Sequence, residues 1–495
     1  MGVMRTKTIE ESIKETEDPE FQLKKKLSAL DLTVFGIGVI IGAGIFTLTG
    51  RAASDYAGPS IAISFVLAAV CCGLAALCYA EFASTVPVSG SAYTFSYASL
   101  GEIVAWIIGW DLLLELMLGA SVVAQGWSQY ATLLLDKFGV TVPEAVAPGS
   151  HFDLPAFVLV ALLTALIAIG IKESLRVNLV LVAVKLFIVL FVIFAGLAFV
   201  NSANYSPFVP PATAGEQTSG LTAPLIQVIF GLEPTTYGVL GIVSGAAIVF
   251  FAYIGFDVVA TTAEEAKNPQ RDLPIGIIAS LVICTVLYVA TTLVITGMVK
   301  YDKINPDAAL AAAFESVGKP GYATLIAAGA VAGLMTVVMT LIIGATRVTF
   351  AMSRDRLLPP SIGRTNPRTG TPVRLTLAIG TVVALVASLT PIGKLEEMVN
   401  IGTLSAFALV SLAVPVLRKR RPDLQRAFKV PGNPVLPVLA ALISIYLMLN
   451  LSVETWLRFL IWMLLGFGIY FFYGYKRSRL HGRTDEDDAK VAADA

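Results

Sequence analysis

Long apolar runs separated by short polar segments dominate the chain from about residue 32 to residue 475. A helix needs about 20 mostly apolar residues to cross the hydrocarbon core of a bilayer. Stretches of roughly that length occur twelve times, at about 32–55, 58–84, 100–132, 154–171, 177–200, 238–263, 273–299, 321–346, 373–391, 397–417, 434–451 and 456–475. They lack the alternation of barrel strands, and backbone groups in lipid must be paired internally. The pattern therefore predicts an all-α polytopic membrane protein with twelve transmembrane helices.

Composition supports a membrane protein. Of the 495 residues, 56% are hydrophobic and only 14% are charged, whereas a soluble domain carries about 25% charged residues. The chain therefore has too little polar surface for a water-soluble globule. Lys plus Arg and Asp plus Glu both number 35, so the net charge indicates neither an acidic nor a basic partner, and no nucleic acid is expected.

Residue types that carry catalytic or cofactor chemistry are scarce. The two histidines are too few for a histidine metal cluster. The cysteines lie in apolar runs without disulfide or redox spacing, and we expect free core thiols at Cys71, Cys72, Cys78 and Cys284. The sequence contains no Ser–His catalytic arrangement and no nucleotide-binding domain. We therefore expect no enzyme activity, no metal and no cofactor.

The distribution of Lys and Arg predicts the orientation, because these residues are enriched in cytoplasmic loops. If the N-terminus is inside, the inside segments hold 27 Lys or Arg and the outside loops hold 7, and the remaining cation, Lys185, lies within a span. We therefore predict a multi-pass protein of the cell membrane with both termini cytoplasmic.

Glycines interrupt two of the predicted spans. Span 1 carries four glycines within nine residues, ending at Gly42 and Gly44. One explanation is close helix packing through small residues; the other is an unwound segment at 42–44. In span 6, Gly255 and Asp257 share an otherwise uncharged run. Two interrupted segments five spans apart are typical of the binding site of an inverted-repeat transporter.

Two motifs carry a resemblance to a known family. The run Gly42-Ala43-Gly44-Ile45-Phe46 resembles the span-1 signature of the amino acid–polyamine–organocation superfamily, and residues 253–257 with 264–274 resemble its span-6 signature and the loop after it. The resemblance covers roughly residues 25–475 and is closest to the bacterial cationic amino acid transporter branch. It implies a leucine-transporter-like fold, in which spans 1–5 and 6–10 form a five-plus-five inverted repeat beside two peripheral helices.

This fold implies a division of the chain into six segments. They are a cytoplasmic N-terminal segment at 1–31, a first repeat at 32–200, an external loop at 201–237, a second repeat at 238–417, spans 11 and 12 with a basic loop at 418–475, and a cytoplasmic tail at 476–495.

The resemblance also assigns a binding site for an α-amino acid between the two interruptions. Its carboxylate would meet the N–H groups of Ala43, Gly44 and Ile45. Its amine would meet the carbonyl groups of Ile40, Phe251, Ala252 and Ile254. Helix breaks are assigned to Gly42, Gly44 and Gly255. Phe251 matches an aromatic gate; the alternative, without the motif, is a packed or lipid-facing aromatic.

Charges inside spans are costly and usually functional. Lys185 matches a lysine of proton-coupled relatives, and a buried lysine releases its proton more readily than one in water; otherwise it would snorkel to the interface. Asp257 is the other candidate for proton coupling. Asp111 and Glu115 lie four residues apart, so they share a helix face. Glu115 either contacts the substrate amine or a cationic side chain, relays protons, or forms a structural polar pair with Asp111.

These features predict a secondary active transporter that imports L-amino acids by proton symport with alternating access. The substrates would be cationic, such as arginine or lysine, or small and neutral, such as alanine. The alternative is an amino acid exchanger without net proton coupling, and a channel or receptor is a third class. The expected partners are the amino acid, a proton and membrane lipid. The sequence indicates neither the oligomeric state nor a partner subunit.

Overall fold

The computed structural model describes residues 27–480 apart from 86–90, 171–174, 215–219, 232–234, 261 and 367–370. Within these residues the fold is helical, with one two-stranded antiparallel ribbon in which β1 (Thr213–Ala214) pairs with β2 (Thr235–Thr236). Residues 1–26 of the predicted N-terminal segment and residues 481–495 of the predicted tail lie outside the described part. The four cysteines are buried free thiols, as predicted.

The helices of the first half follow the predicted spans. They are α2 (Ala29–Ile40), α3 (Thr49–Ala52), α4 (Ile61–Thr85), α5 (Ser91–Ser99), α6 (Glu102–Lys137), α7 (Leu154–Ala168) and α8 (Leu175–Gly196), with π-helical turns η1 (Gly44–Leu48) and η2 (Ala53–Ala57) on either side of α3.

The helices of the second half also follow the predicted spans. Its helices are α9 (Leu225–Phe230), α10 (Gly238–Val249), α11 (Phe256–Ala260), α12 (Pro269–Met298), α13 (Ala309–Ser316), α14 (Pro320–Arg354), α15 (Val373–Leu389) and α16 (Ile392–Arg420), with a 3-10 turn η8 (Phe250–Tyr253) between α10 and α11. The chain continues through α17 (Val435–Leu449), α18 (Val453–Ile469), the π-helical turn η11 (Tyr470–Gly474) and α19 (Tyr475–Arg477).

Every predicted span coincides with one of these helices or with a pair of them. By length and hydropathy, eight described helical segments are clear membrane spans. Four further apolar helices, α2, α7, α15 and α17, have only 10–17 residues. The shortness of α2 has a physical reason, because the span that it begins is interrupted at residue 41.

Local sequence explains where several helices begin. Ser28 and Asp31 form a capping box at the start of α2. Asp153 caps α7, accepting hydrogen bonds from Ala156 N at 3.0 Å and from Ser128 Oγ at 2.6 Å. Pro occupies the first turn of α12 and α14, where its missing N–H is harmless.

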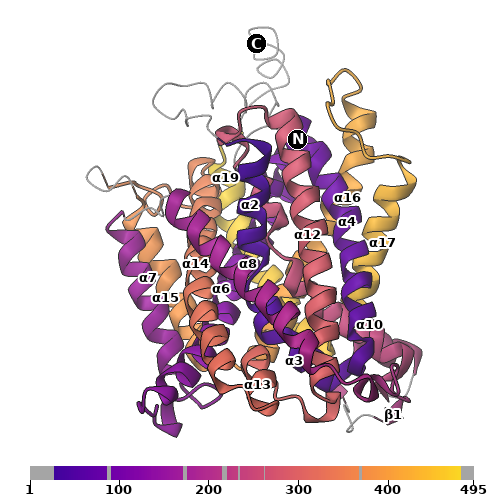
Figure 1. Ribbon diagram of the computed structural model, residues 1–495. Helices are drawn as coiled ribbons and strands as arrows, with labels where there is room; N and C mark the ends of the chain where they lie inside the picture. Colours follow the sequence, from indigo (N-terminus) through magenta and orange to yellow (C-terminus); the bar gives the residue numbers. More distant parts are fainter. Residues whose placement is uncertain are drawn as a thin grey trace.

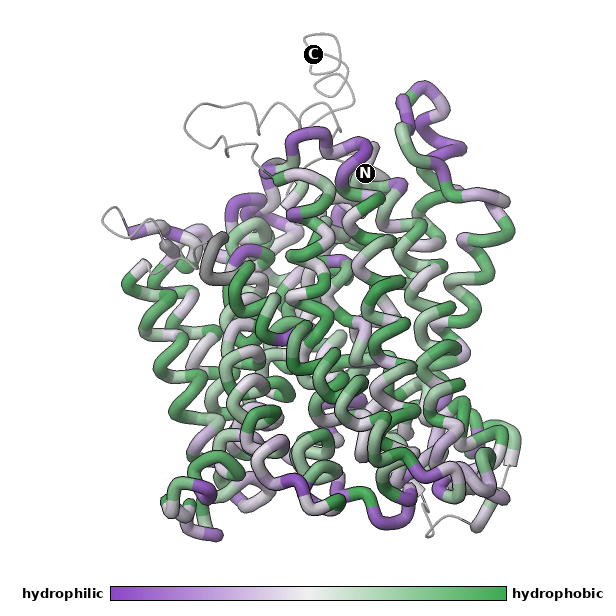
Figure 2. The backbone as a smooth tube through the Cα atoms, in the orientation of Figure 1, coloured by the Kyte–Doolittle hydropathy of each residue, from purple (hydrophilic) through white to green (hydrophobic). Residues whose placement is uncertain are grey.

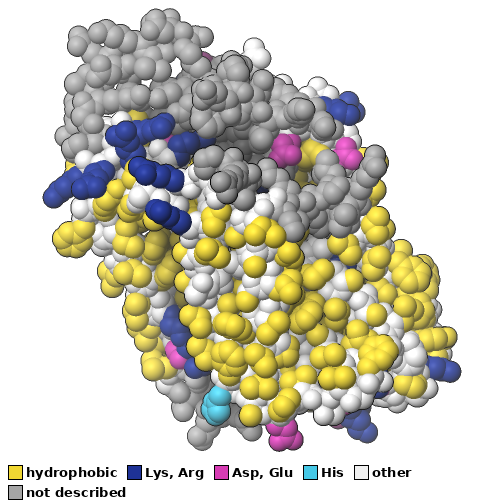
Figure 3. Space-filling model, turned by 90° about the vertical axis from the view of Figure 1, so that its left-hand side faces the viewer, with side chains coloured by type: hydrophobic (Ala, Val, Ile, Leu, Met, Phe, Trp, Pro, Cys, Tyr) yellow, Lys and Arg dark blue, Asp and Glu magenta, His cyan; other side chains and the backbone are white. Residues whose placement is uncertain are grey.

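The helices run roughly parallel to one axis and form a bundle whose two ends differ (Figure 1). We call the end where α2 begins and α19 ends the termini end, and the end that carries α13 and β1 the opposite end. Hydrophobic residues fill the middle of the bundle and polar residues gather at both ends (Figure 2). Apolar side chains also cover the middle of the face in Figure 3, as expected for a surface that contacts lipid.

Contacts between the helices place the two interrupted spans at the centre. α6 packs against α14. α2 lies against α12, and α10 correspondingly lies against α4. α6 also contacts α16, as α14 contacts α8. These contacts of α2 and α6 therefore correspond to contacts of α10 and α14, and the interrupted spans pack against α4 and α12.

Candidate binding site at two broken helices

The first break lies between α2 and η1. Helix α2 ends at Ile40, and Ile41 leaves the helical conformation with φ −72° and ψ 87°. Ala43 returns to helical angles, φ −55° and ψ −29°, immediately before the π-helical turn that begins at Gly44. Residues 41 and 42 are therefore the unwound part, and Gly44 belongs to the first turn of the next helical segment.

The second break follows the 3-10 turn η8. Ile254 has an extended conformation with ψ 134°, and Gly255 has φ +121°. This φ lies where a residue with a side chain is strained. A Cβ atom at Gly255 would also lie 2.7 Å from Val39 Cγ1 and 3.3 Å from Ile40 N. Only glycine therefore suits position 255, and the second break touches the last turn of α2.

The two breaks also meet at a second point. A Cβ atom at Gly44 would overlap both the Cα and the Cβ of Ala252. The backbone of the first break therefore lies directly against the backbone of the second. This contact brings together the predicted substrate-binding residues of both spans, which are all at most 9% exposed: Ile40, Ala43, Ile45, Phe251, Ala252 and Ile254. A lipid-facing position for Phe251 is wrong, since its ring is inside the protein.

Broken helices leave backbone carbonyl groups without helical partners, and side chains from other helices supply donors at the first break. Ile37 O accepts the N–H of Ile41 at 2.9 Å. Gly38 O accepts a hydrogen bond from Lys185 Nζ on α8. Ile40 O accepts one from the hydroxyl of Tyr288 on α12 at 2.6 Å.

The same arrangement occurs at the second break. The hydroxyl of Tyr288 also lies 2.9 Å from Ala252 O. Asn400 Nδ2 on α16 donates to Ala247 O at 2.9 Å and to Ile248 O at 3.3 Å. Tyr288 and Asn400 thus partner carbonyl groups near the breaks, and the sequence analysis missed both.

Tyr288 bridges the two breaks, and aromatic neighbours hold its ring. The ring centroid lies 5.4 Å from that of Tyr253 and 5.7 Å from that of Phe65. A phenol hydroxyl carries one proton, so at any moment it donates fully to only one of the two carbonyl groups. The carbonyl of Ile40 or of Ala252 is therefore left with capacity to accept another donor.

Three acidic side chains lie inside the bundle near these breaks. Asp111 and Glu115 on α6 are both buried, as their shared helix face predicted. Asp111 accepts a hydrogen bond from Ser405 on α16. Glu115 lies close enough to Asp257 for their charges to interact. Thr403 on α16 lies close to the carboxylate of Glu115, while its hydroxyl donates to Val399 O at 3.0 Å.

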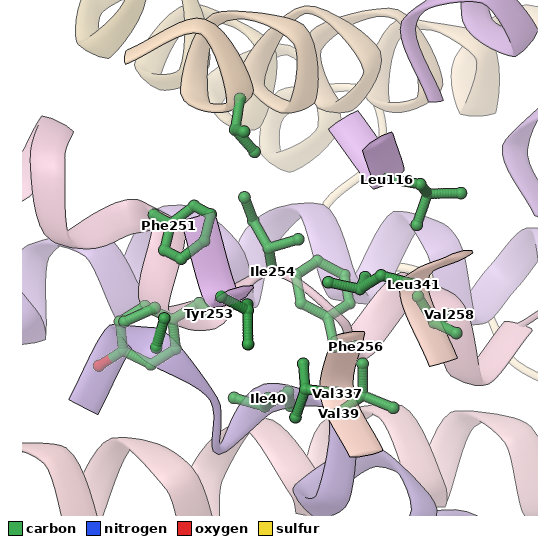
Figure 4. Packing of buried hydrophobic residues seen from close by; sticks show 14 of the residues in the cluster. Val39, Ile40, Leu116, Phe251, Tyr253, Ile254, Phe256, Val258, Val337 and Leu341 are labelled. Carbon is green, nitrogen blue, oxygen red and sulfur yellow. The ribbon is translucent and has the colours of Figure 1, made fainter. Parts of the chain in front are cut away.

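Apolar side chains surround the breaks on the remaining sides. Figure 4 shows Ile40, Phe251 and Ile254 close to side chains from α6 and α14, with Leu116, Val337 and Leu341 labelled. All six are buried. Buried main-chain polar groups and apolar side chains thus lie together at the breaks, and the buried acid Glu115 comes from α6.

Ion pairs join helices at both ends of the bundle. At the opposite end, Arg51 on α3 contacts Glu396 on α16 at 3.0 Å, beside a cavity of about 250 Å³. At the termini end, Glu81 on α4 accepts hydrogen bonds from Arg418 Nε at 2.8 Å and from Val430 N at 2.7 Å. Each tie joins α16 or the loop after it to a helix of the first half.

Replacing Tyr288 with Phe tests the bridge. The change keeps the ring but removes the one hydroxyl donor that the carbonyl groups of Ile40 and Ala252 share, so we expect a loss of about 1–3 kcal/mol in stability. Thermal unfolding of the purified protein in detergent measures it. Tyr446, whose side chain is exposed, provides the matched control as Tyr446→Phe. An unfolding midpoint of Tyr288→Phe equal to that of the control would show that the bridge contributes nothing.

Comparisons with known proteins agree with this geometry. Residues 27–472 match the model of a family described as "Amino acid permease". The chain is 48% identical over 489 residues to the branched-chain amino acid permease BcaP of Bacillus subtilis, covering 97% of this chain and 99% of that protein.

Two other relatives are named for different substrates. The methylthioribose transporter of Bacillus subtilis is 44% identical, covering 93% of this chain and 95% of that protein. The vacuolar cationic amino acid transporter 4 of Arabidopsis thaliana is 39% identical, covering 82% of this chain and 65% of that protein. The family is not enzymatic. The chain therefore belongs to the amino acid permease family of the amino acid–polyamine–organocation superfamily, and it is a multi-pass amino acid transporter.

Proposed function

We propose that the chain imports L-amino acids with apolar, branched side chains by proton symport, at the site formed by the two broken helices. The observation that carries the proposal is the backbone contact between the breaks, where Gly44 lies against Ala252. Polar main-chain groups deep in a membrane protein are tolerated only inside protein or around a cavity. A zwitterion is a suitable ligand for such groups.

The predicted five-plus-five repeat remains part of the proposal. Corresponding contacts in the two halves support it: α2 of the first half lies against α12 of the second, and α10 of the second half lies against α4 of the first. The family also implies a leucine-transporter-like fold. The proposed repeats keep their sequence boundaries, 32–200 and 238–417, with two peripheral spans after them.

In the proposed complex, the substrate carboxylate meets the N–H groups of Ala43, Gly44 and Ile45. These groups begin a helical segment, whose N-terminal dipole favours an anion. The ammonium group meets carbonyl oxygens of Ile40, Phe251, Ala252 and Ile254. Because Tyr288 already contacts two of these oxygens, its hydroxyl must share them with the ammonium group.

The proposed side-chain preference rests on the apolar walls. Val337, Leu341 and Leu116 lie near the breaks (Figure 4) and offer no hydrogen bond to a polar side chain. The relative with 48% identity is named for branched-chain amino acids. A second candidate class is cationic amino acids, favoured by the buried carboxylate of Glu115.

Uptake into proteoliposomes decides between these classes. We expect leucine, isoleucine and valine to compete with labelled leucine, and arginine and alanine to compete weakly. Glu115→Gln removes the charge that a cationic side chain would need, so a cationic transporter would lose at least about tenfold in arginine uptake. Saturable arginine uptake that exceeds leucine uptake in the parent protein would contradict the proposed preference.

The same vesicles separate symport from exchange. A symporter accumulates leucine in empty vesicles under an inward proton gradient, and a protonophore abolishes the accumulation. An exchanger takes up labelled leucine only into vesicles preloaded with amino acid. Uptake that needs preloading and ignores the protonophore would replace symport with exchange.

Lys185 and Asp257 are the proposed proton-coupling residues. Both are buried. Lys185 reaches from α8 to Gly38 O near the end of α2, and its side chain packs against Gly333 on α14. A change in its proton number therefore acts directly on a carbonyl next to the first break. Asp257 lies in the first turn after the second break.

Lys185 variants test this role. Lys185→Met removes the titratable group, and Lys185→Arg keeps a positive charge that does not dissociate. We expect both to lose proton-driven leucine accumulation by at least about tenfold. The control is Lys137→Met, since Lys137 pairs with Glu315 near the end of α6 at 2.6 Å. Proton-driven accumulation by Lys185→Met at the parent level would remove Lys185 from the mechanism.

We propose that the termini end faces the cytoplasm, in a cell membrane. The 27 to 7 division of Lys and Arg supports this orientation. Alternating access would then alternately loosen the Arg51–Glu396 tie outside and the Glu81–Arg418 tie inside.

Cysteine labelling tests the orientation, because the four native thiols are buried. Lys303→Cys at the opposite end should react with a membrane-impermeant maleimide in intact cells. Asp423→Cys, in the loop after α16, should react only after the membrane is permeabilised. Both positions are exposed. The reverse labelling pattern would invert the proposed topology.

A further inference from the structure

A basic cavity opens at the termini end, away from the two breaks. Its volume is about 1160 Å³. Three segments form it: the last turn of α14, the loop at 355–365, and the stretch from Tyr473 to Arg479 that contains α19. Neither the proposed amino acid site nor the proposed proton-coupling residues line it.

The charge of this cavity is one-sided. Six of its lining residues are cationic: Arg354, Arg356, Arg364, Lys476, Arg477 and Arg479. No Asp or Glu is among its described lining residues. Two buried acids lie next to the lining: Asp355 accepts a hydrogen bond from the Tyr93 hydroxyl at 2.7 Å, and Glu102 accepts one from the hydroxyl of Ser478. Six like charges around one hollow repel one another, and a bound anion relieves that repulsion.

Local structure holds some of these cations in place. The guanidinium of Arg477 lies over the ring of Tyr473, 4.8 Å from its centroid. Arg356 has φ +60°, and its N–H donates to Ser353 O at 3.1 Å in the turn that follows α14. Such a φ is disfavoured for any residue with a Cβ atom, and strained conformations of this kind cluster at functional sites. Glycine would adopt this φ without strain, so the arginine at this position indicates a role for its side chain.

The surroundings indicate a membrane ligand. Phe471 and Phe472, which directly precede Tyr473, are 48% and 89% exposed. They continue the surface of α18, which is mostly unburied within the protein. Figure 3 shows Lys and Arg side chains gathered above an apolar belt at the edge of the molecule. Cations above an apolar wall match a molecule with a phosphate head and acyl chains.

We propose that the cavity formed by α14, the loop 355–365 and α19 binds the phosphate headgroup of an anionic phospholipid. Arginine binds phosphate oxygens in a bidentate manner, and lysine adds a point charge. The acyl chains would follow the apolar surface of α18 beside Phe471 and Phe472. A headgroup in this position joins α14, which reaches Val337 and Leu341 near the breaks, to the peripheral helix α18. This proposal does not depend on which amino acid is transported.

Lipid retention measured by native mass spectrometry tests the proposal on the full-length protein in neutral detergent. We expect phosphatidylglycerol to bind and phosphatidylcholine to bind at least about tenfold more weakly. The binding of inorganic phosphate and of glycerol phosphate is measured separately. If either binds as tightly as phosphatidylglycerol, the site is for a soluble phosphate compound and the lipid assignment is overturned. Equal binding of the two lipids would also overturn it.

Charge variants locate the site. The triple variant Arg356→Gln, Arg364→Gln, Lys476→Gln should weaken phosphatidylglycerol binding by about 100-fold. Each lost cation weakens the binding of an anionic lipid by about fivefold, and the three losses multiply. The matched control, Lys300→Gln, Lys303→Gln, Lys319→Gln, removes three cations at the opposite end. Undiminished lipid binding in the first variant, or an equal loss in the control, would refute the assignment.

Arg356→Gly separates binding from folding. It relieves the positive φ while removing one cation, so its thermal stability without added lipid should equal or exceed that of the parent. Its binding of phosphatidylglycerol should still fall by about fivefold. A purely structural Arg356 would give the opposite result, with unchanged lipid binding.

Discussion

The structure depends on one constraint: a main-chain carbonyl or amide in the middle of a membrane protein must have a partner. Two spans of this chain break their helices halfway, and donors from three other helices contact the carbonyl groups that result. Lys185 reaches Gly38 O, Tyr288 reaches Ile40 O and Ala252 O, and Asn400 reaches Ala247 O and Ile248 O. The broken segments are therefore supported parts of a packed core.

The same constraint accounts for the small residues at the breaks. Close approach of two backbones leaves no room for side chains, which is why Gly44 lies against Ala252 and Gly255 against Val39 and Ile40. Apolar side chains then close the site on the sides of α6 and α14. Polarity for an amino acid backbone thus comes from the main chain, and selectivity for its side chain comes from the walls.

Much of the fold was accessible from the sequence, because long apolar runs and glycine interruptions are local features. The positions of the spans, the interruption near Gly42 and Gly255, and the burial of Asp111 and Glu115 required only hydropathy and helical spacing. Tyr288 and Asn400 were missed, because a tyrosine or an asparagine within an apolar run has many roles. Their roles appear only when α12 and α16 are packed against the breaks. Lys185 was noticed as a rare charge, whereas its partner, a carbonyl of α2, has no signature in the sequence.

The contacts of the Tyr288 side chain restrict which helices can move relative to one another. Phe65 on α4 and Tyr253 beside the second break hold the ring, while its hydroxyl reaches the ends of α2 and η8. Three elements, α4, α2 and η8, thereby contact a single phenol of α12, so relative sliding among them would break contacts that have no replacement in lipid. We therefore expect relative motion to occur elsewhere. Helices α6 and α14 contact this region mainly through dispersion, so they can slide without leaving a buried polar atom unpaired.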